Sequence, residues 1–150
     1  MSSQVLPGAA TKPALSYLAH LGISGDLHFA EGVRLVARGL PYKAWLAFSR
    51  ATTLGSRELA AAIGIAERTI ARRKTAGRLH PDESDRLARV ARIFDLVLQF
   101  HEGDRDAALR WLSAPQVGLG GAVPLAVASS DLGAREIETL IGRLEHGVIA

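Results

Sequence analysis

Residues 59–74 have the sequence LAAAIGIAERTIARRK, which predicts two short helices joined at a glycine. Ala60 is small enough to let the two helices cross closely, and Gly64 can adopt the positive φ that a tight turn requires. Four aliphatic side chains fall at the positions that point inward from both helices: Leu59, Ile63, Ile65 and Ile70. The stretch therefore predicts a helix-turn-helix, a motif that places its second helix in the major groove of DNA.

The second helix of this motif carries a polar face in which basic residues dominate. Its outward positions hold Glu67, Arg68, Thr69, Arg72, Arg73 and Lys74. Arginine can bind guanine or a phosphate, and threonine can contact a phosphate or a thymine methyl group. We predict that these six residues bind DNA; an ordinary helical hairpin with a solvated basic face is the alternative. Arg73 stands where such motifs commonly have an aliphatic residue, so its guanidinium should bend outward or the helix should be shifted.

Positive charge is concentrated around this motif. The whole chain has a net charge of +3, but residues 56–80 hold six Arg or Lys and only two Glu, which gives +4. Residues 1–55 contribute +3, residues 81–113 and 131–150 contribute −2 each, and residues 114–130 are uncharged. A basic strip on a nearly neutral body indicates a defined nucleic-acid face. Because a single short recognition helix rarely suffices, we expect a dimer that presents two copies about one helical turn of DNA (~34 Å) apart.

Composition limits the class of protein. With 150 residues the chain can form one domain or two small ones, and the absence of cysteine excludes disulfides and thiolate metal sites. The absence of cysteine also fits a protein of a reducing compartment. The N-terminus lacks the pattern of a signal peptide, and no stretch approaches the ~20 apolar residues of a membrane span. We therefore expect a cytoplasmic protein with no membrane partner.

Residue types capable of chemistry do not form a catalytic or metal-binding pattern in the sequence. The five histidines have no metal-ligand spacing. The stretch 118–121 is rich in glycine but is not followed by Lys-Ser/Thr, so it predicts a turn rather than a phosphate-binding loop. Asp82, Glu83 and Asp85 suit helix capping and solvent exposure better than catalysis. Because no nucleophile, base and orienting group can be combined, we predict neither an enzyme nor a bound cofactor or metal ion.

The chain before the motif predicts an arm and two helices. Residues 1–25 predict a flexible arm, with at most a helical turn at 17–21. A helix over 26–38, capped by Asp26 and ended by Gly39, would carry Phe29, Val33 and Val36 or Ala37 on one face. Pro41 should begin a helix that extends to Thr52 with Trp45 and Phe48 inward, and Ser56 should cap the first helix of the motif.

A long helix over 82–101 is predicted next. Its core positions are Leu87, Val90, Phe94 and Val97 or Leu98. Residues 93–100 are apolar nearly all round, so this half must pack against partners on every side. Either it is the central helix of one chain or it forms the seam of a homodimer.

Residues 103–150 predict three further helical segments. Asp104 should cap the first, which carries Trp111, and Pro124 should open a short apolar segment. Ser130 or Asp131 should start the last helix, which has an apolar stripe of Ile137, Leu140, Ile141 and Leu144. This stripe suits a core better than a contact surface, and Trp45 and Trp111 are expected in the core. No stretch predicts a strand, so the fold should be all-α.

The C-terminal residues resemble a known protein-binding module. The matching positions are Trp111-Leu112, Pro115, Leu119-Gly120-Gly121, Pro124-Leu125, Gly133-Ala134, Ile137, Leu140-Ile141 and the stretch from Arg143 to Gly147-Val148. Their spacing is similar to that of the toxin-binding module of the Xre/MbcA/ParS-type antitoxins. The stretch Arg68-Thr69-Ile70-Ala71-Arg72-Arg73 resembles the recognition segment of the Xre-like helix-turn-helix in the same proteins. Together the resemblance covers residues 27–150.

The resemblance implies both an architecture and a function. An Xre-like helix-turn-helix domain would be followed by a small helical toxin-binding domain, with an arm at 1–25, a DNA-binding and dimerisation region at 26–102 and the toxin-binding domain at 103–150. The partner would be a RES-domain toxin that degrades NAD, whose active site the antitoxin obstructs. The helix-turn-helix would bind operator DNA and repress the shared operon, as a homodimer or in a higher-order complex with toxin. A stand-alone Xre-like transcriptional regulator without a toxin partner is the alternative.

The polar face and the end of the last helix are the expected toxin contacts, because the apolar stripe is needed for the core. We predict that these contacts include Arg135, Glu138, Arg143, His146 and Val148. An apolar anchor with a charged rim is the usual anatomy of a tight interface.

Overall fold

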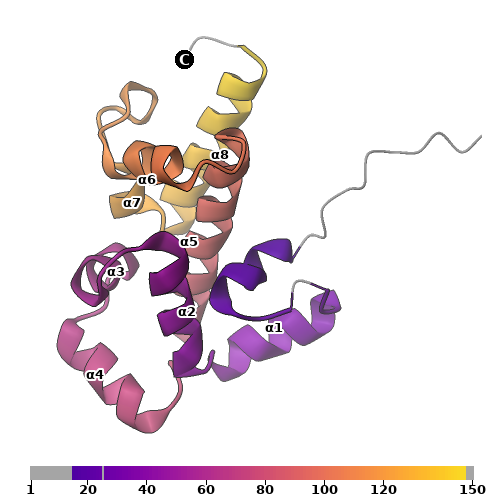
Figure 1. Ribbon diagram of the computed structural model, residues 1–150, viewed down its shortest axis with the longest axis vertical. Coiled ribbons are helices and arrows are strands. Elements are labelled where there is room, and N and C mark those ends of the chain that lie inside the picture. Colours follow the sequence, from indigo (N-terminus) through magenta and orange to yellow (C-terminus); the bar gives the residue numbers. More distant parts are fainter. Residues whose placement is uncertain (1–14, 25, 148–150) are drawn as a thin grey trace, which may run out of the picture.

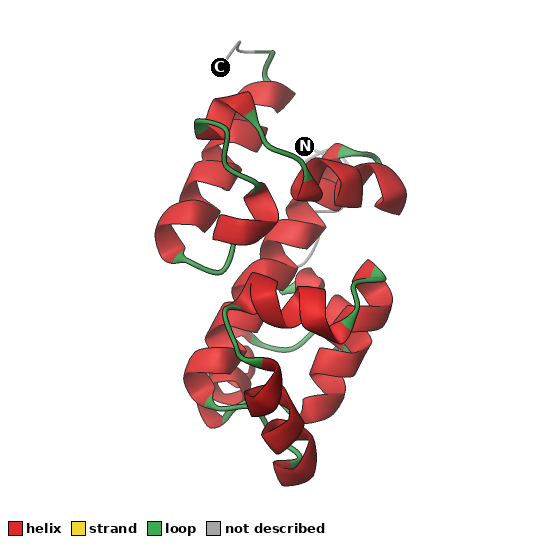
Figure 2. Ribbon diagram, turned by 90° about the vertical axis from the view of Figure 1, so that its left-hand side faces the viewer, coloured by secondary structure: helices red, strands yellow, loops and turns green. Residues whose placement is uncertain are grey.

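The computed structural model describes residues 15–24 and 26–147 and contains helices joined by short loops in this part of the chain (Figures 1 and 2). The elements are η1 (Ser16–Leu21), α1 (Phe29–Arg38), α2 (Tyr42–Thr52), α3 (Ser56–Ile63), α4 (Glu67–Ala76), α5 (Pro81–Phe100), α6 (Arg105–Ser113), η2 (Val117–Leu119), α7 (Pro124–Val127) and α8 (Asp131–Glu145). These ranges hold no strand, and one isolated antiparallel bridge joins Pro41 to Arg78. The prediction of an all-α fold is confirmed.

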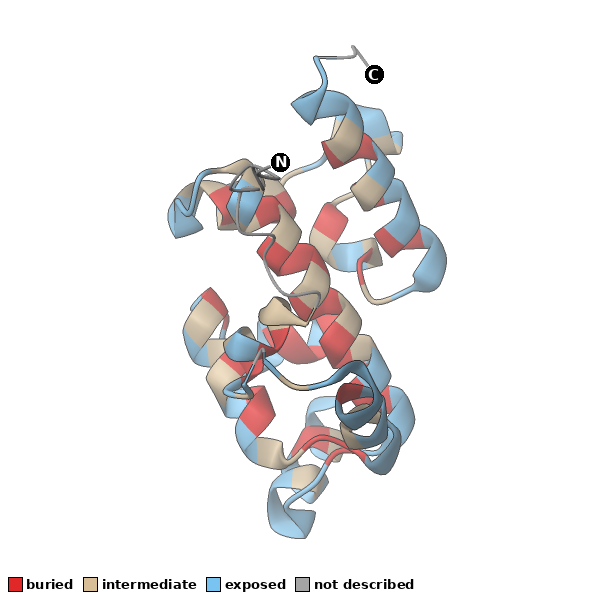
Figure 3. Cartoon of the chain, turned by 90° about the vertical axis from the view of Figure 1, so that its right-hand side faces the viewer, coloured by how far each residue is buried: buried red, intermediate tan, exposed pale blue. Residues whose placement is uncertain are grey.

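The longest helix, α5, is the central element of the molecule. It contacts five other elements: η1, α1, α3, α6 and α8. Leu87, Val90, Phe94 and Val97 are all buried, as predicted (Figure 3). In its second half Ile93, Phe94 and Val97 are buried within the same chain, whereas Leu96, Leu98 and Phe100 are half-buried. Helix α5 is thus the central helix of the described chain.

The helix-turn-helix shares one hydrophobic core with the rest of the described chain, and α3 contacts both α5 and α7. Leu59, Ile63, Ile65 and Ile70 are buried, as the spacing predicted. Trp45 and Phe48 of α2 are also buried, and the rings of Phe48 and Phe94 meet edge to face at 5.8 Å. The motif is thus held rigidly against the central helix.

Part of the predicted N-terminal arm is ordered against the core, so the arm was predicted too long. Leu18 and Leu21 of η1 are 1% exposed. His20 Nε2 lies 2.8 Å from Oδ1 of the buried Asp95, which ties η1 to α5. The apolar residues of 15–21 lack helical periodicity but are inserted between α2 and α5. Residues 1–14 and 25 lie outside the described residues.

Helix α1 differs from its prediction in its cap, and part of its apolar face is exposed. It begins at Phe29 with His28 as the N-cap, rather than at a cap formed by Asp26. Phe29 and Val33 are 76% and 51% exposed. The helix instead packs through Gly32, where an added Cβ would lie 2.8 Å from Leu15 Cδ1. The apolar residues do share one face of the helix, as predicted, but within residues 15–24 and 26–147 Phe29 and Val33 remain exposed.

Other helix ends follow the sequence closely. The side chains of Asp104 and Ser130 accept hydrogen bonds from Ala107 N (3.1 Å) and Gly133 N (2.9 Å), as N-caps do. Ser56 was predicted as a cap but is the first residue of α3, with Gly55 before it.

The predicted core residues of the C-terminal half are buried to different extents. In α8, Ile137, Leu140 and Ile141 are buried, whereas Leu144 is 39% exposed and does not belong to the core. Trp111 is half-buried.

Length and hydropathy distinguish the described helices from membrane-spanning helices. None of them in residues 15–24 and 26–147 combines the length and the apolar character that crossing a bilayer requires.

Candidate functional site

The turn between α3 and α4 has the hydrogen bonds of a helix that ends at a left-handed glycine. Gly64 has φ +74°, and its N–H donates to Ala61 O at 3.2 Å. The N–H of Ile65 donates to Ala60 O at 2.9 Å. This pair of bonds satisfies the last carbonyls of α3 and directs the chain into α4. The prediction of a positive φ at Gly64 is confirmed.

Helix α4 presents an exposed, mostly basic surface at one end of the molecule (Figure 1). Four of its predicted DNA-binding residues are exposed: Glu67, Arg68, Arg72 and Lys74. Thr69 is half-buried, and Ile70 anchors the opposite face in the core. The structure thus brings these residues together on one short helix whose outer side is free of other described elements.

Arg73 differs from its neighbours on α4, because its side chain turns toward α5. Its Nε lies 2.6 Å from Glu83 Oε1 and its Nη2 lies 3.1 Å from Glu83 Oε2. The side chains of Arg73 and Glu83 are 15% and 5% exposed. The expectation of an outward-bending guanidinium was therefore wrong. A two-point ion pair with a buried carboxylate replaces the aliphatic contact that the position usually makes.

The electrostatics of Glu83 reflect this arrangement. Burial raises the pKa of Glu83, but hydrogen bonds from Arg73 and from the backbone N–H of His80 outweigh burial and hold the pKa below its ordinary value. The hydrogen bond to Glu83 raises the pKa of Arg73. Glu83 does cap α5, as predicted, because its Oε1 accepts from His80 N at 2.8 Å. The expectation that it is solvated was wrong.

A second residue of α5, which the sequence did not single out, fixes the turn of the motif. Arg86 Nη1 donates to the carbonyls of Ile63 at 3.1 Å and Gly64 at 3.0 Å, at the C-terminal end of α3. Glu83 holds α4 and Arg86 holds α3, so the first two turns of α5 set the angle between the two helices. The one signal in the sequence was Arg73 itself, since an arginine at an inward position requires a carboxylate partner.

The described members of the predicted toxin-binding set lie on α8 or at its C-cap. Arg135 is exposed and pairs with Asp131 at 2.9 Å, whereas Glu138 pairs with Arg92 of α5. Arg143 and His146 are exposed at the C-terminal end of the helix. At about 100° per residue, these side chains fall within one half of the helix circumference. Val148 lies outside the described residues.

Two family models match the chain in succession. The antitoxin Xre-like helix-turn-helix domain matches residues 31–92, and the antitoxin Xre/MbcA/ParS C-terminal toxin-binding domain matches residues 95–147. The junction between the two matches falls inside α5, so both units share the central helix.

Two curated relatives have the same name. The protein named Antitoxin Xre from Yersinia enterocolitica is 43% identical over 94 residues, which are 62% of this chain and 64% of the relative. The protein named Antitoxin Xre from Photorhabdus laumondii is 32% identical over 117 residues, which are 77% of this chain and 79% of the relative. With a helix-turn-helix domain and a toxin-binding domain in that order, the chain belongs to the Xre antitoxin family.

Proposed function

We propose that this chain neutralises a RES-domain toxin that degrades NAD, by docking on the toxin and obstructing its active site. The observation that carries the proposal is the match of residues 95–147 to the toxin-binding domain of Xre/MbcA/ParS antitoxins. The chain acts by binding and contributes no catalysis of its own. A toxin that consumes NAD acts in the cytoplasm, which is where we place the antitoxin. Arg135, Glu138, Arg143, His146 and Val148 are the proposed polar and terminal contacts.

The second proposed activity is repression of the operon that encodes both proteins. The exposed basic face of α4 supports it, because Arg68, Arg72 and Lys74 are exposed, pair with no acidic side chain of the described residues, and lie beside Glu67 and Thr69 on the same helix. Arg73 has a different role in this proposal. Since its guanidinium is committed to Glu83, it orients the recognition helix instead of contacting DNA.

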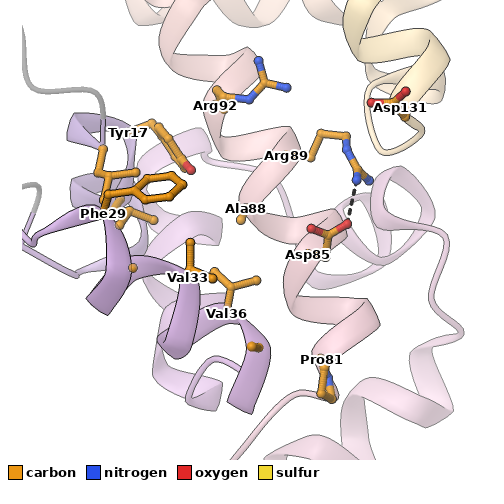
Figure 4. Close-up of a pocket in the computed structure, with 14 residues that line it drawn as sticks. Tyr17, Phe29, Val33, Val36, Pro81, Asp85, Ala88, Arg89, Arg92 and Asp131 are labelled. Atoms are coloured by element: carbon orange, nitrogen blue, oxygen red, sulfur yellow. Dashed lines mark hydrogen bonds and ion pairs between the residues drawn. The ribbon is translucent and has the colours of Figure 1, made fainter.

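Operator binding is expected to use two copies of the chain, and the apolar face of α1 is the proposed dimer surface. Phe29, Val33 and Val36 lie beside α5 along a groove of about 520 Å³ (Figure 4). The far side of the groove carries both signs of charge, from Asp85, Asp131, Arg89 and Arg92. A two-fold axis sets a surface against itself, so a face with an apolar centre and mixed charges suits a second copy of the chain. The predicted seam along 82–101 is mostly covered within the chain.

The toxin proposal is tested by co-purification and rescue. The chain and the RES-domain protein encoded beside it should co-purify, and co-expression should restore growth to cells that make the RES-domain protein. A stand-alone regulator would bind its operator but would neither co-purify with that protein nor rescue growth. Deleting residues 131–150 is a blunt test, because it removes the buried Ile137 and Ile141 and disrupts the core.

A further inference from the structure

We propose that the loop of residues 114–122, with Val117 at its exposed position, is the apolar anchor by which this chain docks on its toxin. The inference rests on the proposed function and deepens it, because it names the surface that makes the contact. Val117 is 92% exposed, compared with 76% for Phe29 and 72% for Leu132. A single exposed valine needs no explanation by itself. Val117 differs from other exposed apolar residues because hydrogen bonds hold the backbone of its loop in place.

The loop is closed by its own backbone hydrogen bonds. Gln116 N donates to Ala122 O at 3.0 Å, and Gly121 N donates to Gln116 O at 2.9 Å. The side-chain Nε2 of Gln116 donates to Trp111 O at 2.9 Å, which fastens the loop to the end of α6. Gly120 and Gly121 have φ of +65° and +89°, conformations that other residues rarely adopt. The exposed valine is therefore presented by a fixed backbone, so that little conformational entropy is lost on binding.

The loop also lies close against α8 at Gly118, where any side chain would have to displace Leu140. A Cβ on Gly118 would collide with the side chain of the buried Leu140, with Leu140 Cδ2 only 3.1 Å away. Leu144 follows Leu140 by one helical turn on the same face and is 39% exposed. Because η2 contacts α8, the loop that carries Val117 lies against the helix on which Leu144 is a second exposed apolar side chain.

The charge of this surface indicates the kind of partner. Residues 114–130 contain no charged side chain, so the loop offers nothing to a nucleic-acid backbone. The exposed Arg143 and His146 lie near the C-terminal end of α8, on other sides of the helix from Leu144, so they can border the contact but are not part of its apolar centre. An apolar centre with a polar rim fits a protein partner with an uncharged apolar pocket. The recognition helix α4 lies at the opposite end of the molecule, and the loop falls within the match to the toxin-binding domain.

The test measures the affinity of full-length variants for the RES-domain protein encoded beside the chain. Val117→Asp is expected to weaken binding at least about tenfold, because it places a charge in the apolar contact. Val117→Leu should keep wild-type affinity, since it preserves the apolar contact on the same loop. The control is Leu46→Asp, which changes an exposed leucine on α2, outside the match to the toxin-binding domain. It should leave the affinity unchanged.

Two readouts separate this inference from the proposed function. Operator affinity and melting temperature should be unchanged in Val117→Asp, because the side chain contacts neither DNA nor the core. Wild-type affinity of Val117→Asp for the toxin, or an equal loss in Leu46→Asp, would overturn the anchor while leaving the antitoxin function in place. A wild-type chain that does not bind the RES-domain protein would overturn the proposed function and the anchor together.

Discussion

Two glycines of α8 lie in opposite environments, although both are inside the same helix. A Cβ on Gly133 would lie 2.6 Å from the carbonyl carbon of Val127 and 2.8 Å from Ser130 Oγ, where backbone has to move to make room. A Cβ on Gly142 would meet nothing within 4 Å. The first glycine allows the close approach of α7 to α8, and the second has no packing role.

These environments predict opposite effects of the same substitution. Gly133→Ala should lower the free energy of unfolding by about 1–3 kcal/mol, because it overpacks the α7–α8 junction. Gly142→Ala should raise it by about 0.5–1 kcal/mol, because alanine is the better helix former. Chemical denaturation of the two variants beside the wild type measures both. Equal effects, or a stable Gly133→Ala, would contradict the packing described for α8.

The Arg73–Glu83 pair predicts a dependence of stability on pH. A carboxylate whose pKa is lowered in the folded chain stabilises it above the ordinary value of about 4.5, and this contribution is lost as the pH falls through the lowered pKa. Glu83→Gln should therefore reduce the melting temperature near neutral pH, and the difference from wild type should shrink well below pH 4.5.

The matched control for this prediction is Glu136→Gln, which changes an exposed carboxylate on α8. Its melting temperature should stay close to wild type near neutral pH. If Glu83→Gln were as stable as this control near neutral pH, Glu83 would not hold the recognition helix.

At the scale of the elements, α4 predicts how DNA affinity responds to salt. Arg68→Ala combined with Arg72→Ala should lower operator affinity and reduce the slope of log affinity against log salt by about 2, since each lost phosphate contact removes roughly one unit. The matched control is Arg105→Ala with Arg110→Ala, which removes the same charge from exposed positions on α6. Titrations at several salt concentrations should leave this control at the wild-type slope. An unchanged slope in the α4 variant would show that its arginines do not bind DNA.

The elements also show where prediction from sequence succeeds and where it stops. The ends of α3, α6 and α8 were predictable because Gly64, Asp104 and Ser130 satisfy backbone groups within a few residues. The pairing of Arg73 with Glu83 was not predictable, because a contact between two helices depends on their crossing angle.

Exposure of an apolar face is a second property that local pattern does not determine. The spacing of Phe29 and Val33 predicts an apolar face on α1, but whether the chain covers that face depends on where α5 and η1 lie. For the same reason Val117 could not be recognised as a contact residue before the loop around it was known.

At the scale of the whole molecule, the exposed face of α1 predicts how the chain assembles. Phe29→Asp combined with Val33→Asp should convert a dimer into a monomer, because it places two carboxylates in the apolar centre of the proposed interface. Light scattering after gel filtration measures the mass. The variant should still bind toxin through the opposite end, and Val117→Asp should remain dimeric. A double variant with wild-type mass would exclude this face as the dimer surface.

The shared helix α5 connects two ends with separate proposed partners, DNA at α4 and toxin at the end of α8 (Figure 1). We expect that toxin binding at the end of α8 prevents loss of NAD. Cellular NAD should be measured in cells that make the neighbouring RES-domain protein alone, with the wild-type chain, or with Arg68→Ala and Arg72→Ala. We predict that NAD falls in the first case and is maintained in the other two. NAD that falls equally in the presence of the wild-type chain would contradict the account.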